Sequence, residues 1–423
     1  MRSRISGKAV IAGLAAAMIF VAGRAEAANG DPCNGLTDEN NDVPALYIEN
    51  GDTQEPVVKK IGKLLMQSSS KLRVFYRNRP TCNIRNDLFS GAKMLTVVDG
   101  TTARPVRYIP ADPAFDPASA APTCTVPDVD ELGAEPIALG IGATYLSSCP
   151  QTPAQPADVG VFNGPIQAYG FITNKSSSQV AITAEEGYLA YGFTEGEGQA
   201  APWVVQNLRF KRGNTASTTL TMSSAIRLLP TQMKAAPDSG TSEAIITSVM
   251  NSPNPEATLG ILGTELYDQR RADIKLLAFK TFGQRYAYFP DSTNTSFDKQ
   301  NVRDGHYLPW SPTPYIAKVT PGTTTIADAN ARRFYELVMG TRIGDDVDAL
   351  LQVIQSGLVP ECAMKVTRAG DGADLSLYDD PAPCGCYFEK NVPQGTTSCT
   401  TCTVGDDAPC NGGKCRFGYC EAR

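Results

Sequence analysis

Histidine is almost absent from this chain, since His306 is the only one among 423 residues. A single histidine excludes metal centres built from several histidines, and it leaves a serine or cysteine hydrolase only one possible base. Asp304 lies two residues before His306, and such a pair can activate a nucleophile. No Gly-x-Ser-x-Gly turn accompanies the pair. The sequence therefore favours a structural histidine, and we expect no enzymatic activity.

Long apolar runs are missing as well. Residues 1–27 combine basic residues, an apolar stretch over Ala9–Ala22 and an A-x-A site at Ala25–Ala27, the pattern of a signal peptide cleaved after Ala27. The apolar stretch is shorter than the roughly 18 residues that a membrane span needs. No lipobox precedes Cys33. We expect an exported protein, periplasmic or extracellular, that neither spans a membrane nor carries a lipid anchor.

Positive charge is in the minority, because 38 lysines and arginines face 44 acidic residues and the net charge is −6. Cleavage after Ala27 removes four basic residues and one acidic residue, so the net charge becomes −9. A net negative charge of this size argues against a positively charged surface that binds polyanions. We therefore expect no nucleic acid partner.

Cysteine is absent between residues 149 and 362 but frequent on both sides of this gap. The first group is Cys33, Cys82, Cys124 and Cys149, and the second is Cys362, Cys384, Cys386, Cys399, Cys402, Cys410, Cys415 and Cys420. In an exported chain the even count predicts six disulfides, of undetermined connectivity, and no free thiol. A zinc site around Cys399-x-x-Cys402 is the alternative. The long middle must fold by core burial, whereas disulfides should staple the tail from Cys384.

Short apolar strands alternate with amphipathic helices along most of the chain. Apolar runs predict strands at 45–48, 72–76, 164–172 and 258–262, and helical spacing predicts helices at 56–65, 183–190, 218–226 and 242–250. Thr183 and Glu186 form the pattern of a capping box. This alternation is typical of the α/β class with largely parallel sheets.

Two acidic patterns indicate other chemistry but are incomplete. Asp238-Ser239-Gly240 spells the loop of an aspartic protease, whose mechanism needs two such carboxylates, and the chain has one copy. The stretch from Asp371 to Asp380 lacks the spacing of a calcium loop. We therefore interpret the second pattern as part of a solvated linker.

The order of elements over residues 43–360 resembles the two-lobed extracytoplasmic solute-binding proteins, in particular the phosphate-binding members of the type II class. The resemblance is carried by Asn50–Gln54, the loop 212–219, Thr258–Leu262 and the segment after Phe279. The loop aligns without gaps to the family's Arg-x-Asp-Gly-Ser-Gly-Thr. The resemblance implies an α/β fold of two lobes, a type II periplasmic-binding-protein-like fold, followed by a small disulfide-rich C-terminal module.

Together with the cysteine pattern, the resemblance divides the chain into five parts. These are a signal peptide at 1–27, a first lobe made of 28–160 and 290–368, a second lobe at 161–289, a linker at 369–383 and a Cys-rich module at 384–423.

In that family an oxyanion is held at helix N-termini by backbone N–H groups, hydroxyls and a guanidinium. The matching positions here are Gly51, Asp52, Thr53, Gln54, Thr81, Arg212, Asn214, Ser217 and Thr218. Two positions depart from the family's pattern, because Asn214 replaces an aspartate that accepts the ligand's proton and Ala216 replaces a serine. A surface ion pair for Arg212, and helix capping for Thr53 and Thr218, remain alternatives.

The resemblance implies a small anion as ligand, no cofactor, and an ABC-type membrane transporter as partner. The alternative is a secreted interaction protein that keeps this fold and uses the Cys-rich tail to contact its partner. An N-terminal signal peptide fits both functions.

Overall fold

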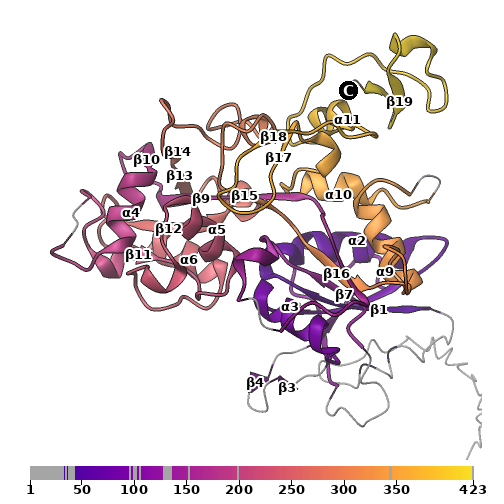
Figure 1. Ribbon diagram of the computed structural model, residues 1–423, viewed down its shortest axis with the longest axis horizontal. Coiled ribbons are helices and arrows are strands. Elements are labelled where there is room, and N and C mark those ends of the chain that lie inside the picture. The colour runs from indigo at the N-terminus through magenta and orange to yellow at the C-terminus, as the bar shows by residue number, and fades with distance from the viewer. Residues whose placement is uncertain are drawn as a thin grey trace, which may run out of the picture.

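The computed structural model describes Cys33, Leu36 and residues 43–94, 97–98, 102–103, 106–126, 136–150, 153–197, 200–342 and 345–421. The predicted signal peptide lies outside these residues. Two α/β lobes lie side by side, and the last residues form an extension beside them (Figure 1). Within the described ranges, no helix is both long and apolar enough to cross a membrane.

The first lobe contains a seven-stranded sheet with the order β6-β5-β2-β1-β7-β16-β8. Its strands are β1 (Ala45–Asn50), β2 (Arg73–Asn78), β5 (Val106–Tyr108), β6 (Thr123–Cys124), β7 (Leu139–Ile141), β8 (Val159–Phe162) and β16 (Tyr315–Lys318). The central strands β1, β2 and β7 are parallel, whereas the flanking pairs are antiparallel. The carboxyl ends of the three parallel strands therefore meet at one edge of the sheet.

Two helices begin at that edge and cover opposite faces of the sheet. The short 3-10 helix η1 (Asp52–Gln54) and α2 (Glu55–Gln67) follow β1, and α3 (Thr81–Ser90) follows β2. Successive side chains of a strand point to opposite faces, so Leu46 and Ile48 pack in the cluster of α2, whereas Tyr47 packs in that of α3. The alternation of β1 thus fixes where both helices start.

The second lobe is built around β9 (Ile166–Asn174), a strand buried along all nine residues. Its main sheet has the order β11-β12-β9-β13, with β15 pairing to β9 beside it, and β10 and β14 form a small second sheet. The other strands are β10 (Ala181–Thr183), β11 (Arg209–Phe210), β12 (Leu259–Gly263), β13 (Ile274–Leu276), β14 (Ala278–Lys280) and β15 (Trp310–Pro312). The helices are α4 (Ala184–Gly192), α5 (Ser217–Ala225), α6 (Ser242–Met250), α7 (Thr264–Gln269) and α8 (Gln300–Arg303).

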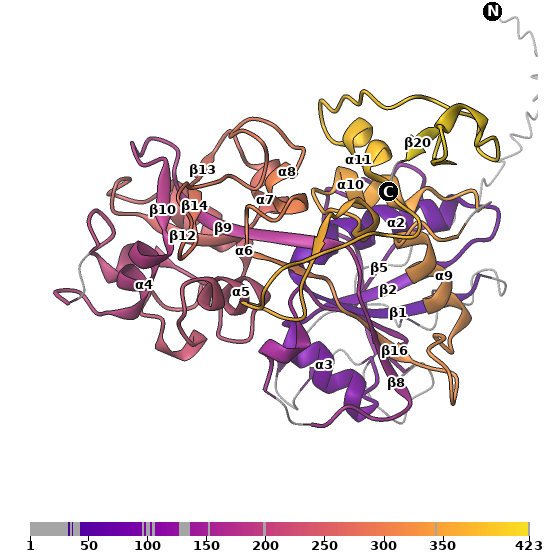
Figure 2. The ribbon, with the colours of Figure 1, turned by 45° about the horizontal axis from the view of Figure 1, so that its top comes forward.

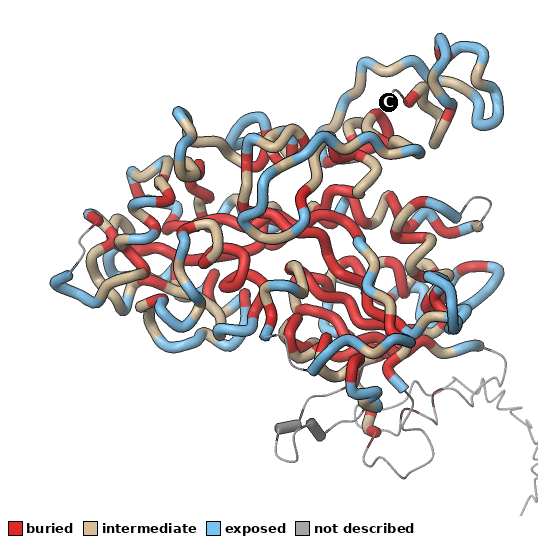
Figure 3. The backbone as a smooth tube through the Cα atoms, in the orientation of Figure 1, coloured by how far each residue is buried: buried red, intermediate tan, exposed pale blue. Residues whose placement is uncertain are grey.

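The cysteine-free middle of the chain holds together by burial, as its length predicts. Buried residues follow the sheets of both lobes (Figure 3). Tyr169 and Phe171 of β9 lie in a large cluster with Ile261 of β12 and Phe279 of β14. The predicted α/β class with two lobes is confirmed by these two sheets and their covering helices.

The chain crosses between the lobes twice. Strand β8 belongs to the first sheet and β9 to the second, and Figure 2 shows β9 running from the second lobe toward the first. On the return, β15 still pairs with β9, whereas β16 pairs with β7 and β8. Residues 290–312 therefore lie with the second lobe, which differs from the predicted division at 290. The reason is packing, because Val302, Tyr307 and Trp310 are buried in the cluster of β9.

The C-terminal segment contains the predicted small disulfide-rich module, and its first helix packs against the body. Helices α9 (Ala329–Val338) and α10 (Ala349–Gln355) cover the first lobe, and the hairpin of β17 (Val366–Thr367) and β18 (Ser376–Leu377) leads to α11 (Gly385–Asn391). Tyr387 and Phe388 of α11 are buried in one cluster with Leu350 and Ile354 of α10. The tail is therefore anchored to the body by an apolar helix face.

The last residues are tied to α11 as well. Strands β19 (Lys414–Arg416) and β20 (Tyr419–Glu421) form a hairpin, and the carboxylate of Glu421 accepts hydrogen bonds from the backbone N–H groups of Cys386 and Tyr387, both at 2.9 Å. A further hairpin joins β3 (Val97–Val98) and β4 (Thr102–Ala103). The C-terminal hairpin thus closes onto the start of α11.

All twelve cysteines are paired, and none is free. The disulfides are Cys33–Cys124, Cys82–Cys149, Cys362–Cys384, Cys386–Cys399, Cys402–Cys415 and Cys410–Cys420. The sulfurs of Cys402, Cys410 and Cys420 lie within 4.8 Å of one another. Since each of them belongs to a disulfide, they offer no thiolate to a metal.

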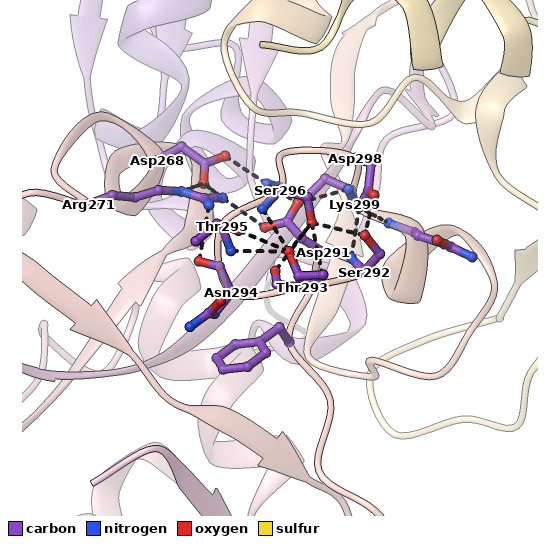
Figure 4. Close-up of polar contacts among 12 residues, drawn as sticks. Asp268, Arg271, Asp291, Ser292, Thr293, Asn294, Thr295, Ser296, Asp298 and Lys299 are labelled. Carbon is purple, nitrogen blue, oxygen red and sulfur yellow. Dashed lines mark hydrogen bonds and ion pairs between the residues drawn. The ribbon is translucent and has the colours of Figure 1, made fainter. Parts of the chain in front are cut away.

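A buried ion-pair network fixes the loop 291–299 of the second lobe (Figure 4). Lys299 is 1% exposed and pairs with Asp268 at 2.7 Å and Asp291 at 2.9 Å. Arg271 pairs with the same two carboxylates at 2.6 and 2.8 Å. Two cations facing two carboxylates compensate the cost of burying charge, so the network anchors the loop to α7.

Candidate functional site

Three helix N-termini at the junction of the lobes lack the usual side-chain caps. The N-cap residues of η1, α3 and α5 are Gly51, Pro80 and Ala216, and none supplies a capping side-chain hydrogen bond. Among the other α-helices, α4, α6, α9 and α10 are capped by a threonine or an aspartate, whereas α2, α7, α8 and α11 also lack a side-chain cap. First-turn N–H groups without a cap are a favourable environment for an anion.

Direct contacts between the lobes bring these helix starts together. Gln54, the last residue of η1, donates a hydrogen bond to Gln167 of β9. The hydroxyl of Tyr169 donates to the carbonyl oxygen of Ala143, whose N–H donates to Thr81 Oγ1 at 3.0 Å. We call the region lined by these contacts the interlobe seam.

Two buried hydroxyls in the seam have no partner. Thr53 in η1 and Thr218 in α5 are each 2% exposed, and neither Oγ1 atom makes a hydrogen bond to the described part of the chain. Neither residue is a helix cap, since both lie inside the first turn. A buried polar group without a partner costs about 1–3 kcal/mol. The two lobes thus each present an unsatisfied hydroxyl at the seam.

Arg212 joins the two lobes through an ion pair with Asp52 of η1. The hydroxyl of Ser242 lies 3.2 Å from both side chains, and Arg212 Nε has no partner in the described chain. The guanidinium therefore reaches the seam, but a carboxylate of the opposite lobe already occupies one side of it. This is an interlobe ion pair and not a pair confined to one surface.

The remaining predicted residues are only partly brought together. Ser217 is buried at the start of α5, where its hydroxyl favours the ionised form of Tyr169, although burial raises the pKa of that phenol. Asn214 is exposed, and its Oδ1 accepts a hydrogen bond from Lys211 at 2.8 Å. The structure therefore places Asn214 apart from Thr53, Thr218 and Thr81.

Glu265 is a seam residue that the sequence analysis missed. It lies at the start of α7, is 2% exposed, and burial raises its pKa to about 8. The charge of Asp52 raises this pKa further, while the nearby backbone N–H of Glu265 itself and the amide of Gln167 oppose the shift, although neither carboxylate oxygen makes a hydrogen bond within the described chain. A charged residue two positions after the end of the apolar strand β12 was the available signal. Its burial depends on the opposite lobe and on Gln167, which the local sequence does not specify.

A cavity of about 390 Å³ opens at the mouth of the seam. Residues of both lobes line it, namely Asp52, Asn78, Arg79, Pro80, Arg107, Arg212, Gly213, Thr215, Ala216, Asp238, Gly240 and Thr241. Arg79 is paired with Asp87 at 2.8 Å, and Arg212 with Asp52. The cavity therefore carries three guanidinium groups next to the uncapped helix starts.

A loop of the β17–β18 hairpin crosses the seam on another side. Asp371 accepts hydrogen bonds from Thr144 at 3.1 Å and from Ser148 at 2.5 Å, both in the first lobe. The guanidinium of Arg368 lies 4.3 Å from the ring centre of Trp310 in β15. We call residues 368–375 the strap, because it contacts both lobes.

The rival catalytic arrangements are not assembled. Asp304 pairs with Lys365 at 2.8 Å, while the ring of His306 stacks on Tyr288 with a centroid distance of 5.1 Å. Asp238 is exposed, and its Oδ1 accepts a hydrogen bond from Gly240 within the turn. Neither arrangement joins a base to a nucleophile.

Most of the stretch from Asp371 to Asp380 is exposed, as a solvated linker would be, but two of its carboxylates have partners. The carboxylate of Asp371 is buried, and its hydrogen bonds reach across to the first lobe. Asp380 accepts a hydrogen bond from the hydroxyl of Tyr378 at 2.9 Å. The hydrogen bonds from Thr144 and Ser148 to Asp371 hold the start of the stretch against the first lobe.

No family model matches the sequence, and no curated protein matches it. Among solved structures, the chain is similar to an ABC-type phosphate transport receptor from Vibrio cholerae, with 12% identity over 75% of this chain and 99% of that one, and a TM-score of 0.46. A putative phosphate ABC transporter substrate-binding protein with bound phosphate from Clostridium perfringens gives 10% identity, coverages of 75% and 99%, and a TM-score of 0.48.

The reduced OxyR regulatory domain from Pseudomonas aeruginosa is also similar, at 10% identity over 71% of this chain and 99% of that one, with a TM-score of 0.38. The likeness concerns the fold, and it assigns neither ligand nor partner to this chain.

Proposed function

We propose that this protein is an exported solute-binding protein that captures a small anion in the interlobe seam and delivers it to a membrane transporter of the ABC type. The observation that carries the proposal is the pair of buried, unpartnered hydroxyls, Thr53 and Thr218, beside uncapped helix starts of opposite lobes. An anion between them would accept both hydroxyls and the first-turn N–H groups at once.

Electrostatics supports an anionic ligand. The positive ends of the helix dipoles at η1, α3 and α5 favour negative charge, and Arg212 adds a full charge at the same place. Arg212 must exchange part of its contact with Asp52 for the ligand. Six disulfides fit an oxidising compartment outside the cytosol, where a transporter's binding protein works.

Calorimetry with phosphate and with sulfate tests this function on three variants. Thr218→Val keeps the shape but removes one hydroxyl, and we expect it to weaken binding about fivefold, since a neutral hydrogen bond contributes about 1 kcal/mol. Arg212→Ala should weaken binding about ten- to a hundredfold, because a bond to a charged group contributes about 1.5–3 kcal/mol. Thr403→Val, at an exposed threonine of the tail, is the matched control and should bind like the wild type.

Absence of heat with either anion on the wild-type protein, together with an unchanged melting temperature, would contradict the proposal. A specific observation then favours the second candidate, a secreted interaction protein. The lobes are already joined by Arg212–Asp52, by Tyr169 and by the strap, as a fixed scaffold would need. Small-angle scattering that is identical with and without anions would support this candidate.

A further inference from the structure

Arg107 is a cation at the mouth of the seam. It lies in β5, is half-buried, and its guanidinium has no hydrogen-bond or ion-pair partner among the described residues. Burial lowers the pKa of Lys59, and the positive charge of Arg107 lowers it further. Among the described residues, therefore, no carboxylate competes with a ligand for Arg107.

The cavity that Arg107 lines is too large for a bare inorganic oxyanion. Its volume of about 390 Å³ corresponds to roughly 13 water molecules at about 30 Å³ each, whereas an inorganic oxyanion has only five heavy atoms. The seam itself is narrower, because Tyr169 bonds to Ala143 and Gln54 bonds to Gln167 across it. A ligand whose anionic group enters the seam would leave most of the cavity for a larger body.

The lining indicates what kind of body would fit. Ligand pockets are usually lined by apolar and aromatic side chains, but here Pro80 and Ala216 are the only apolar residues of the lining. Asp238 offers acceptor oxygens, and it sits so close to Gly213 that a Cβ there would lie 2.8 Å from its Oδ2. A carboxylate of the protein can accept hydrogen bonds from hydroxyl groups of a ligand, while the neighbouring guanidinium groups bind a negative charge of the same ligand.

We propose that the ligand is an anionic polyol of the size of a sugar phosphate, with its anionic group held by Arg212 and the helix starts, and with Arg107 as a further binding residue for the polyol end or a second charge. This inference rests on the proposed function. The proposal gives Arg107 a role in ligand specificity. Arg107 lies outside the four sequence segments that carry the family resemblance.

The test compares inorganic phosphate, a panel of glycerol 3-phosphate, ribose 5-phosphate and glucose 6-phosphate, and free glucose by calorimetry on the full exported chain. We expect at least one sugar phosphate to bind ten times more tightly than phosphate or glucose. Arg107→Gln should reduce that preference about tenfold and Arg107→Lys less, because lysine keeps the charge. Arg285→Gln, at an exposed arginine of the second lobe, should leave all affinities unchanged.

The outcomes separate this inference from the proposed function. Phosphate binding as tight as the best sugar phosphate would overturn the inference and leave the anion-binding function standing. A preference for sugar phosphates that survives Arg107→Gln, with an unchanged melting temperature, would overturn the role of Arg107. Absence of binding by every compound would overturn both.

Discussion

Replacing Glu265 by glutamine should change how the stability of the protein depends on pH. The carboxyl is buried, and its pKa is about 8 in the folded protein against 4.5 in the unfolded chain. Between these two values the folded state holds a proton that the unfolded state has lost, so stability falls as the pH rises through this window. Glutamine has nearly the same shape and no proton to lose.

The size of the effect follows from the shift. Each pKa unit corresponds to about 1.36 kcal/mol, so a shift from 4.5 to about 8 makes the wild type less stable at pH 9 than at pH 4 by about 5 kcal/mol through this residue alone. Glu265→Gln removes this contribution. The variant should therefore gain on the wild type with every pH unit between 5 and 8.

Urea unfolding at pH 5, 6, 7, 8 and 9 measures the difference between the two proteins. Glu185→Gln is the matched control, because Glu185 is exposed in the first turn of α4 and should not change the pH dependence. Parallel stability curves for the wild type and Glu265→Gln over this range would refute the reasoning. Such parallel curves would mean that, in the dissolved protein, the carboxyl group of Glu265 contacts water or a cationic side chain.

Three further predictions concern the strap, the tail and the cysteines. Asp371→Ala should cost about 1.5–3 kcal/mol of stability by removing acceptors from Thr144 and Ser148, and it should increase hydrogen exchange at residues 143–149, with Asp371→Asn showing a smaller effect; unchanged exchange would mean that the strap does not hold the lobes. Phe388→Ala should cost about 3–5 kcal/mol, since this side chain is 1% exposed in the core, and a melting temperature equal to that of the wild type would show that α11 is detachable. Thiol titration of the unreduced, denatured protein should find no reactive group, and two or more would contradict the six disulfides.

Local sequence signals predicted the elements of this fold well, because such signals act over a few residues. The capping box at Thr183 and Glu186 is present in the structure, and the apolar run at 45–48 became a strand buried on both faces. The alternation of strands and helices was enough to predict the α/β class, whereas the division into two lobes came from the resemblance to the solute-binding proteins. The return crossing was harder to place, because pairing of β15 with β9 joins residues about 140 positions apart.

The sequence by itself determined the class of fold, the fact that every cysteine is paired although not with which partner, and several helix starts at the seam. Tertiary structure alone decided which polar groups meet there. Asn214 aligned well but faces solvent, whereas Glu265 and Arg107 carry no local motif and line the seam and its mouth. The physical reason is that burial and unpaired charge arise from segments far apart in the chain, so that no window of neighbouring residues contains them.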